Sequence, residues 1–146
     1  GGPGLGKTHL AIALAYEACR HNQSVLFTTA VDIINTLSCP PPTVSLAKLI
    51  HRYTTPALLI CDELGYLPID RKGADLLFQV ISGRYERGST VFTTNRVFKD
   101  WAKTFNNDSV VTSAILDRVL HHCEVVLIQG HGQTPSYRTK GLQESA

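Results

Sequence analysis

The chain begins with the stretch Gly1-Gly2-Pro3-Gly4-Leu5-Gly6-Lys7-Thr8, which matches the pattern G-x-x-x-x-G-K-[ST]. Because glycines lack a Cβ, the backbone N–H groups of such a loop can curl around phosphate oxygens. In this pattern Lys7 reaches the β- and γ-phosphates, and the Thr8 hydroxyl ligates Mg²⁺. The alternative is a glycine-rich turn before a helix, with no ligand. The candidate nucleotide-binding residues are Gly1, Gly2, Pro3, Gly4, Leu5, Gly6, Lys7, Thr8 and His9.

Helical and extended patterns alternate after this loop. Apolar spacing predicts helices over residues 9–21, 31–37, 44–53, 72–87 and 109–122, with a short helix or turn over 98–105. Runs of β-branched, aromatic and apolar residues predict strands over 24–29, 57–62, 90–95 and 124–128. The first helix should be well buried, with the positive end of its dipole directed at the phosphates. The alternation predicts an α/β domain whose parallel sheet has crossover connections.

An acidic pair, Asp62 and Glu63, stands at the end of the apolar run 57–62. Such runs are typical of strands buried on both faces in parallel sheets. Asp62 would hold Mg²⁺ there, and Glu63 could orient and deprotonate an attacking water. Taken alone, the pair could equally be a solvated strand end. After a phosphate-binding loop it favours hydrolysis over transfer to a second substrate.

Two further polar residues are candidates for the same chemistry. Asn95 ends the strand expected over 90–95, where a neutral amide could sense the γ-phosphate and position water; the alternative is a turn residue. Arg118 falls on an apolar arc of the last helix, where a permanent cation needs an anionic partner or an interface. It could be an arginine finger on the ATP of a neighbouring subunit. The alternatives are a buried salt bridge, for example with Asp117, or a surface arginine with a buried stem.

The sequence contains two other clusters of potentially functional residues. Side chains of adjacent residues diverge on a helix or strand, so His121, His122 and Cys123 predict no metal site. Lys48 and Arg52 lie four apart on one helix, where like charges repel unless an anion satisfies both. DNA phosphates could be that anion, whereas a solvated helix face is the alternative.

The composition limits the class of protein. The chain has 146 residues, with 14 Lys and Arg against 12 Asp and Glu, which excludes a polybasic arm or an acidic tail. Its 43% of apolar residues suffices for a packed core, yet no run reaches the roughly 18 apolar residues of a membrane span. There is no signal-peptide pattern and no C-x-x-C pair, so a reducing cytoplasm is expected, with Cys19 and Cys61 as buried thiols.

Taken together, segments along almost the whole chain resemble the IstB-like ATP-binding proteins of bacterial insertion sequences, on the DnaC/DnaA side of the AAA+ ATPases. These segments are GGPGLGKTHLAIAL, SVLFTTAVDIINTL, LLICDELGYLPID, GADLLFQVISGRYERGSTVFTTN, and AILDRVLHH followed by SYR. The resemblance implies a P-loop NTPase of the AAA+ (ASCE) class, a three-layer αβα sandwich around a parallel sheet. Residues 1–146 would form the AAA+ core, partly irregular from about residue 129.

The resemblance also implies a function. The protein would bind ATP and Mg²⁺, hydrolyse ATP in the bacterial cytoplasm, and assemble with its own copies on DNA to regulate the transposase of the same element. No membrane partner is implied. The implied residues are Lys7 and Thr8 as Walker A, Asp62 and Glu63 as Walker B, Asn95 as sensor 1 and Arg118 as the finger. Ser136, Tyr137 and Arg138 resemble a segment shared with helicase loaders, but no role follows for them.

One departure from the family concerns the start of the chain. The family's phosphate loop follows a strand and a DNA-binding region, whereas this chain starts at the loop and has no Met. We therefore expect a truncated piece whose first strand is missing. The strand at 124–128 would then be detached from the sheet or would pair with the strand at 90–95. The alternatives to a transposition helper are a DnaC-like helicase loader and an inactive remnant of a mobile element.

Overall fold

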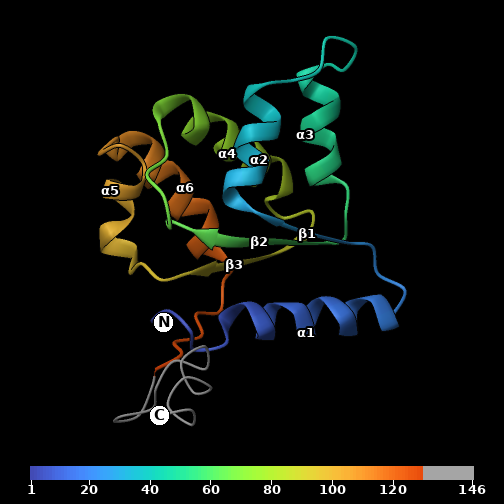
Figure 1. Ribbon diagram of the computed structural model, residues 1–146, viewed down its shortest axis with the longest axis vertical. Coiled ribbons are helices and arrows are strands. Elements are labelled where there is room, and N and C mark those ends of the chain that lie inside the picture. The colour runs from blue at the N-terminus through green and yellow to red at the C-terminus, as the bar shows by residue number, and fades with distance from the viewer. Residues whose placement is uncertain (130–146) are drawn as a thin grey trace, which may run out of the picture.

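The computed structural model describes residues 1–129 and shows a parallel sheet with helices on both faces (Figure 1). The strands are β1 (Val25–Thr29), β2 (Leu58–Leu64) and β3 (Ser89–Thr94), hydrogen-bonded in the order β1-β2-β3. The helices are α1 (Lys7–Arg20), α2 (Ala30–Ser38), α3 (Leu46–Thr54), α4 (Arg71–Arg84), the 3₁₀-helix η1 (Phe98–Asp100), α5 (Trp101–Thr104) and α6 (Ser109–His121). The α/β class and three of the four expected strands are confirmed.

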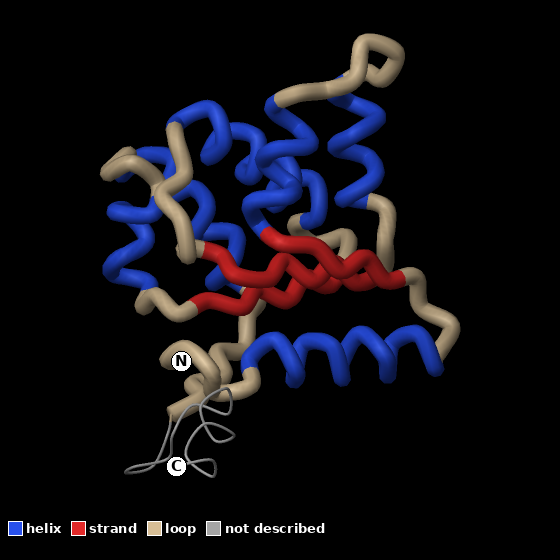
Figure 2. The backbone as a smooth tube through the Cα atoms, viewed as in Figure 1, coloured by secondary structure: helices blue, strands red, loops and turns tan. Residues whose placement is uncertain are grey.

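The helices are divided unevenly between the two faces of the sheet. Helix α1 lies along one face, and α2 to α6 gather on the opposite face (Figure 2). The parallel pairing of consecutive strands requires crossover connections, which α2 with α3 and then α4 provide. The predicted three-layer αβα arrangement is therefore present, with the larger helical layer on the α2–α6 side.

The central strand β2 forms the middle of the core. Leu59, Ile60 and Cys61 are at most 1% exposed, as expected for a continuous apolar run covered on both faces. Burial, and after it the charge of Asp62, raises the pKa of the Cys61 thiol to about 12, so this thiol stays protonated at neutral pH. Cys61 is thus the buried cysteine that the sequence predicts, whereas the same prediction for Cys19 is wrong, because Cys19 is exposed on α1.

Four of the helices begin with an N-cap residue whose side chain accepts a hydrogen bond from the first turn. The side-chain oxygens of Thr29, Ser45, Asp70 and Asp108 accept hydrogen bonds from backbone N–H groups in the first turns of α2, α3, α4 and α6. Helix α1 differs, because Gly6 occupies its N-cap position and supplies no side-chain oxygen. The first N–H groups of α1 therefore lack a side-chain cap at the phosphate loop.

Helix α1 is far less buried than its apolar sequence predicts. Only Ala11 is buried, whereas Leu10, Ile12, Leu14 and Tyr16 are 47–69% exposed. The prediction of a well-buried helix is wrong because, among the described residues, the sheet covers one side of α1 and no other element covers the rest. Even so, no helix within residues 1–129 has the length and apolarity needed to cross a membrane.

Residues 124–128 do not form the predicted strand. They run from the end of α6 back to the phosphate loop, where the carbonyl of Ile128 lies so close to Gly1 that a Cβ there would collide with it. Val125, Val126 and Leu127 are 62–70% exposed. A strand needs a hydrogen-bonded partner strand, and the three strands of the described part of the chain pair only with one another. The segment is therefore detached from the sheet and not paired with β3.

Arg84, in the last turn of α4, is 2% exposed. Its guanidinium donates to the backbone carbonyls of Tyr53, Pro56, Ala57 and Ser89 and to the Thr90 hydroxyl, at 2.6–3.4 Å. Burial lowers the pKa of Arg84, yet five hydrogen bonds replace the lost water. This side chain joins the C-terminal end of α3 to the first residues of β2 and β3.

We expect Arg84→Ala to lower the free energy of unfolding by at least about 3 kcal/mol, because several buried carbonyls lose their donor at once. Urea denaturation followed by circular dichroism measures the change. Arg87→Ala is the matched control: Arg87 is exposed three residues further on, so its loss should stay within about 0.5 kcal/mol. Equal effects of the two substitutions would contradict the structural role of Arg84.

Candidate nucleotide-binding site

The phosphate loop closes around the side chain of Lys7. Gly4 and Gly6 adopt φ angles of 72° and 86°, in the left-handed region that favours glycine. These turns allow the Lys7 Nζ to donate hydrogen bonds to the carbonyls of Gly1 and Gly2, at 2.9 and 2.6 Å. Within residues 1–129 the Lys7 ammonium forms no ion pair with a carboxylate. Its positive charge is therefore available to an anion bound in the loop.

The Asp62 carboxylate connects this loop to the sheet. The Thr8 hydroxyl donates to its two oxygens at 3.2 and 3.1 Å, and the Thr93 hydroxyl of β3 donates to Oδ1. Asp62 is 4% exposed, and no Lys, Arg or His forms an ion pair with it in the described part of the chain. A buried carboxylate whose described partners are hydroxyl groups, with no cationic side chain beside it, favours a bound cation.

A bulge in β2 places Glu63 at the surface beside this buried carboxylate. Between the pairs Cys61↔Phe92 and Leu64↔Thr94, β2 advances three residues while β3 advances two. The extra residue lets Glu63 adopt a left-handed φ of 58°, with its side chain exposed, while Leu64 returns to the core. The Glu63 N–H donates to the Thr93 hydroxyl at 3.0 Å. Thr93 thus holds both the carboxylate and the neighbouring backbone.

Asn95 follows β3 directly and is exposed. Because the carboxyl ends of parallel strands meet at one edge of a sheet, it lies at the same edge as Asp62 and Glu63. The turn is fixed by the Arg96 N–H, which donates to the Thr94 hydroxyl at 3.0 Å. The structure therefore brings Asn95 to the expected edge of the sheet.

Arg118 lies on α6, which packs on the face of the sheet opposite to α1 (Figure 1). Its Nη1 donates to the Ala114 carbonyl at 3.0 Å, and its Cζ lies 4.7 Å from the centroid of the Phe78 ring. No ion pair with Asp117 or another carboxylate occurs within residues 1–129, so the described structure does not contain the salt bridge considered above. The half-buried guanidinium keeps its remaining donors for another partner.

These residues fit a nucleotide with Mg²⁺. The Thr8 hydroxyl and the Asp62 carboxylate provide the oxygen ligands that Mg²⁺ prefers, and they are already in contact with each other. The loop provides the Lys7 ammonium and the uncapped N-terminus of α1, which both attract phosphate. Thr8 and Asp62 could hold the metal, and the loop could hold the β- and γ-phosphates.

Comparison with known proteins identifies the family of this chain. Residues 1–145 match the family model described as IstB-like ATP binding protein. The chain belongs to the IstB-like ATP-binding protein family. A protein named for ATP binding in insertion sequence IS5376 of Geobacillus stearothermophilus is 40% identical over 99% of this chain and 56% of its own length. Its counterpart in IS232 of Bacillus thuringiensis is 44% identical over 96% of this chain and 54% of its own length. The chain thus spans about half the length of these IstB-like relatives.

A solved structure identifies the fold as that of an AAA+ P-loop ATPase. DnaA from Aquifex aeolicus, solved with bound AMPPCP, superposes with a TM-score of 0.72 over 99% of this chain and 42% of DnaA, at 18% identity. At this identity the likeness concerns the fold alone. The IstB-like chain therefore shares the AAA+ architecture with a protein that binds an ATP analogue.

Other predicted residues of the IstB-like chain lie apart from this site. Lys48 and Arg52 are exposed on α3, as a DNA-contacting pair would have to be. The SYR triplet, residues 136–138, lies outside the described residues.

Thr93 belongs to the site but was not predicted from the sequence. A hydroxyl two residues before Asn95, near the end of a buried strand, is a signal that could have identified it.

Thr93→Val keeps the shape of the side chain but removes the donor to Asp62 and the acceptor for the Glu63 N–H. We expect it to lower the free energy of unfolding by about 2 kcal/mol, measured by urea denaturation without nucleotide. Thr28→Val is the control, because the Thr28 hydroxyl of β1 reaches only the neighbouring Thr29 carbonyl, at 3.4 Å. Its effect should stay within about 0.5 kcal/mol. A smaller loss in Thr93→Val than in Thr28→Val would show that Thr93 does not hold the site.

Proposed function

We propose that this chain hydrolyses ATP with Mg²⁺ and that it serves as a helper of DNA transposition, assembling on DNA and regulating the transposase of its insertion sequence. The observation that carries the proposal is the contact of Thr8 and Thr93 with the buried Asp62 carboxylate. That contact joins the phosphate loop to the strand ends that carry Glu63 and Asn95. A site that only binds ATP would not need the exposed Glu63 carboxylate beside the proposed metal ligands, so its presence favours hydrolysis.

Each residue has a distinct part in the proposed reaction. The N–H groups of the loop and Lys7 bind the β- and γ-phosphates, and Mg²⁺ held by Thr8 and Asp62 would neutralise their charge. The exposed Glu63 carboxylate accepts a proton from the attacking water. Asn95 orients that water from the neighbouring strand end. The left-handed backbone of Glu63, held by Thr93, keeps the base in place.

The link to DNA rests on the family and on the surface of α3. Relatives of this chain are named as ATP-binding proteins of insertion sequences, elements that move by acting on DNA. Lys48 and Arg52 present two cations on an exposed helix face, and DNA phosphates would relieve their mutual repulsion. A DnaC-like helicase loader would bind a replicative helicase in place of a transposase. Co-purification distinguishes the two alternatives: a transposase bound to the chain supports the transposition helper, and a replicative helicase supports the loader.

We expect Lys7→Ala to abolish tight ATP binding, because the phosphates lose their cation. Glu63→Gln should bind ATP as the wild type does, but hydrolyse it at least about 100-fold more slowly, because only the base is lost. Titration with labelled ATP and a phosphate-release assay separate the two effects. Glu17→Gln, an exposed carboxylate on α1, is the control and should leave both unchanged. Undiminished turnover in Glu63→Gln would remove Glu63 from catalysis, and no turnover in the wild type would favour an inactive remnant.

Arg118 is proposed to act on the ATP of a neighbouring subunit. Arg118→Ala should bind ATP normally and lose ATPase activity only under conditions in which subunits assemble. A mixture of Arg118→Ala and Lys7→Ala should recover activity, because an intact nucleotide site can then meet an intact arginine. Arg87→Ala in place of Arg118→Ala is the control and should be active alone. If no ratio restores activity although circular dichroism shows folded subunits, Arg118 is not a finger.

A further inference from the structure

A second cluster of potential ligands lies at the ends of α4 and α6, remote from the phosphate loop. Glu86, His121 and His122 each offer one ligand atom, and these atoms all lie within 4.8 Å of one another. His122 Nε2 and Glu86 Oε1 are 3.4 Å apart. All three side chains are exposed, so an ion could reach them from solvent.

The backbone explains why two adjacent histidines point to the same place. Helix α6 ends at His121, and His122 leaves the helix with φ −131°. The two rings therefore lie side by side, with centroids 4.0 Å apart. The expectation that these side chains diverge is wrong, because it assumed one regular element through both residues. Glu86, with a left-handed φ of 57°, completes the group from the turn after α4.

Tyr85 orients one of the two histidines. Its hydroxyl is hydrogen-bonded to His121 Nδ1, and its ring stacks on that imidazole at 5.9 Å between centroids. This contact occupies Nδ1, so we assign Nε2 as the nitrogen that would bind a metal. Metal-binding histidines usually have their second nitrogen fixed in this way.

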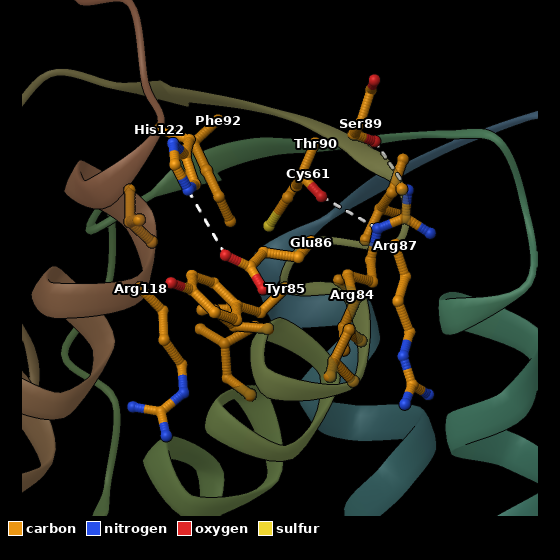
Figure 3. Close-up of a pocket in the computed structure, with 17 residues that line it drawn as sticks. Cys61, Arg84, Tyr85, Glu86, Arg87, Ser89, Thr90, Phe92, Arg118 and His122 are labelled. Atoms are coloured by element: carbon orange, nitrogen blue, oxygen red, sulfur yellow. Dashed lines mark hydrogen bonds and ion pairs between the residues drawn. The ribbon is translucent and has the colours of Figure 1, made fainter.

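The electrostatic setting suits a cation despite three nearby arginines. Helices α4 and α6 both end here, and the negative ends of their dipoles meet at the cluster. The Arg84 guanidinium is saturated by carbonyls and the Thr90 hydroxyl. Figure 3 shows the guanidinium groups of Arg87 and Arg118 pointing away from the Glu86–His122 pair.

The cluster also borders a cavity of about 430 Å³ between α4, α6 and the sheet, lined in part by Tyr85, Glu86 and His122 (Figure 3). None of the residues assigned to the phosphate loop or the acidic pair lines this cavity. An ion at the cluster would therefore be separate from the Mg²⁺ proposed for Thr8 and Asp62.

We propose that Glu86, His121 and His122 bind a transition-metal ion of the Zn²⁺ class. Two imidazole nitrogens and one carboxylate are a ligand set that Zn²⁺ accepts and that Mg²⁺, which prefers oxygen, does not. Because all three side chains are exposed, water could complete the coordination. The bound ion ties the C-terminal end of α4 to that of α6, the helix that carries Arg118. This proposal is independent of ATP hydrolysis.

The test measures Zn²⁺ binding to the purified chain in excess Mg²⁺, which keeps oxygen-only sites filled. Competition with a coloured chelator gives the affinity, and the visible spectrum of bound Co²⁺ reports the ligand geometry. We expect one Zn²⁺ per chain, at least about 10-fold weaker binding in His122→Ala and in Glu86→Gln, and a loss of similar size in Tyr85→Phe, which frees His121 Nδ1. Zn²⁺ should also raise the Tm of the wild type more than that of these three variants.

His21→Ala is the matched control. His21 Nε2 lies 3.2 Å from Glu17 Oε1 on α1, which makes an exposed His–Glu pair like that of His122 but without the second histidine. Its substitution should leave the Zn²⁺ affinity unchanged. Equal affinity in the wild type and in folded His122→Ala, or loss of binding in His21→Ala, would overturn the proposal. So would a wild-type chain that is folded by circular dichroism and binds no Zn²⁺.

Discussion

The arrangement of the nucleotide site depends on one buried carboxylate. Asp62 stands at the end of the central strand and accepts hydrogen bonds from Thr8, at the start of α1, and from Thr93 on β3. These contacts fix the phosphate loop against the sheet edge where Glu63 and Asn95 lie. The carboxylate has hydroxyl partners only, so its charge remains uncompensated by protein cations in the described structure. A bound cation is the partner that physical chemistry favours for such a group.

The strands that carry the site at their carboxyl ends are fixed at their N-terminal ends by the rest of the fold. Arg84 joins α3 to the beginnings of β2 and β3 through backbone carbonyls, so the strands are anchored at their N-terminal ends. Helix α1 is held mainly by the sheet face and by the Thr8 contact, and its outer side is apolar and exposed. The two helical layers are therefore unequal: the α2–α6 layer contains most of the core, and the α1 layer carries the loop.

The sequence predicts what is encoded locally. The glycine pattern, the apolar runs and the acidic pair at a strand end identify the loop, the three strands and the residues Thr8 and Asp62, because each signal lies within a few consecutive positions. Properties that depend on neighbours distant in the chain were not predictable. The exposure of α1 and the meeting of Glu86 with His121 are of this kind. The detachment of residues 124–128 from the sheet, in contrast, was one of the two outcomes expected from the sequence. The bulge at Glu63 was also hidden, since it depends on register with β3.

The central claim is that Asp62 and Thr8 form a Mg²⁺ site that assists nucleotide binding, and the Mg²⁺ dependence of ATP affinity tests it most directly. ATP affinity would be measured for the wild type and for Asp62→Asn, each with Mg²⁺ and with EDTA. The account predicts that Mg²⁺ strengthens ATP binding by the wild type, and that Asp62→Asn binds ATP with the same affinity in both conditions. Wild-type binding that is indifferent to Mg²⁺, or an equal gain from Mg²⁺ in Asp62→Asn, would contradict it.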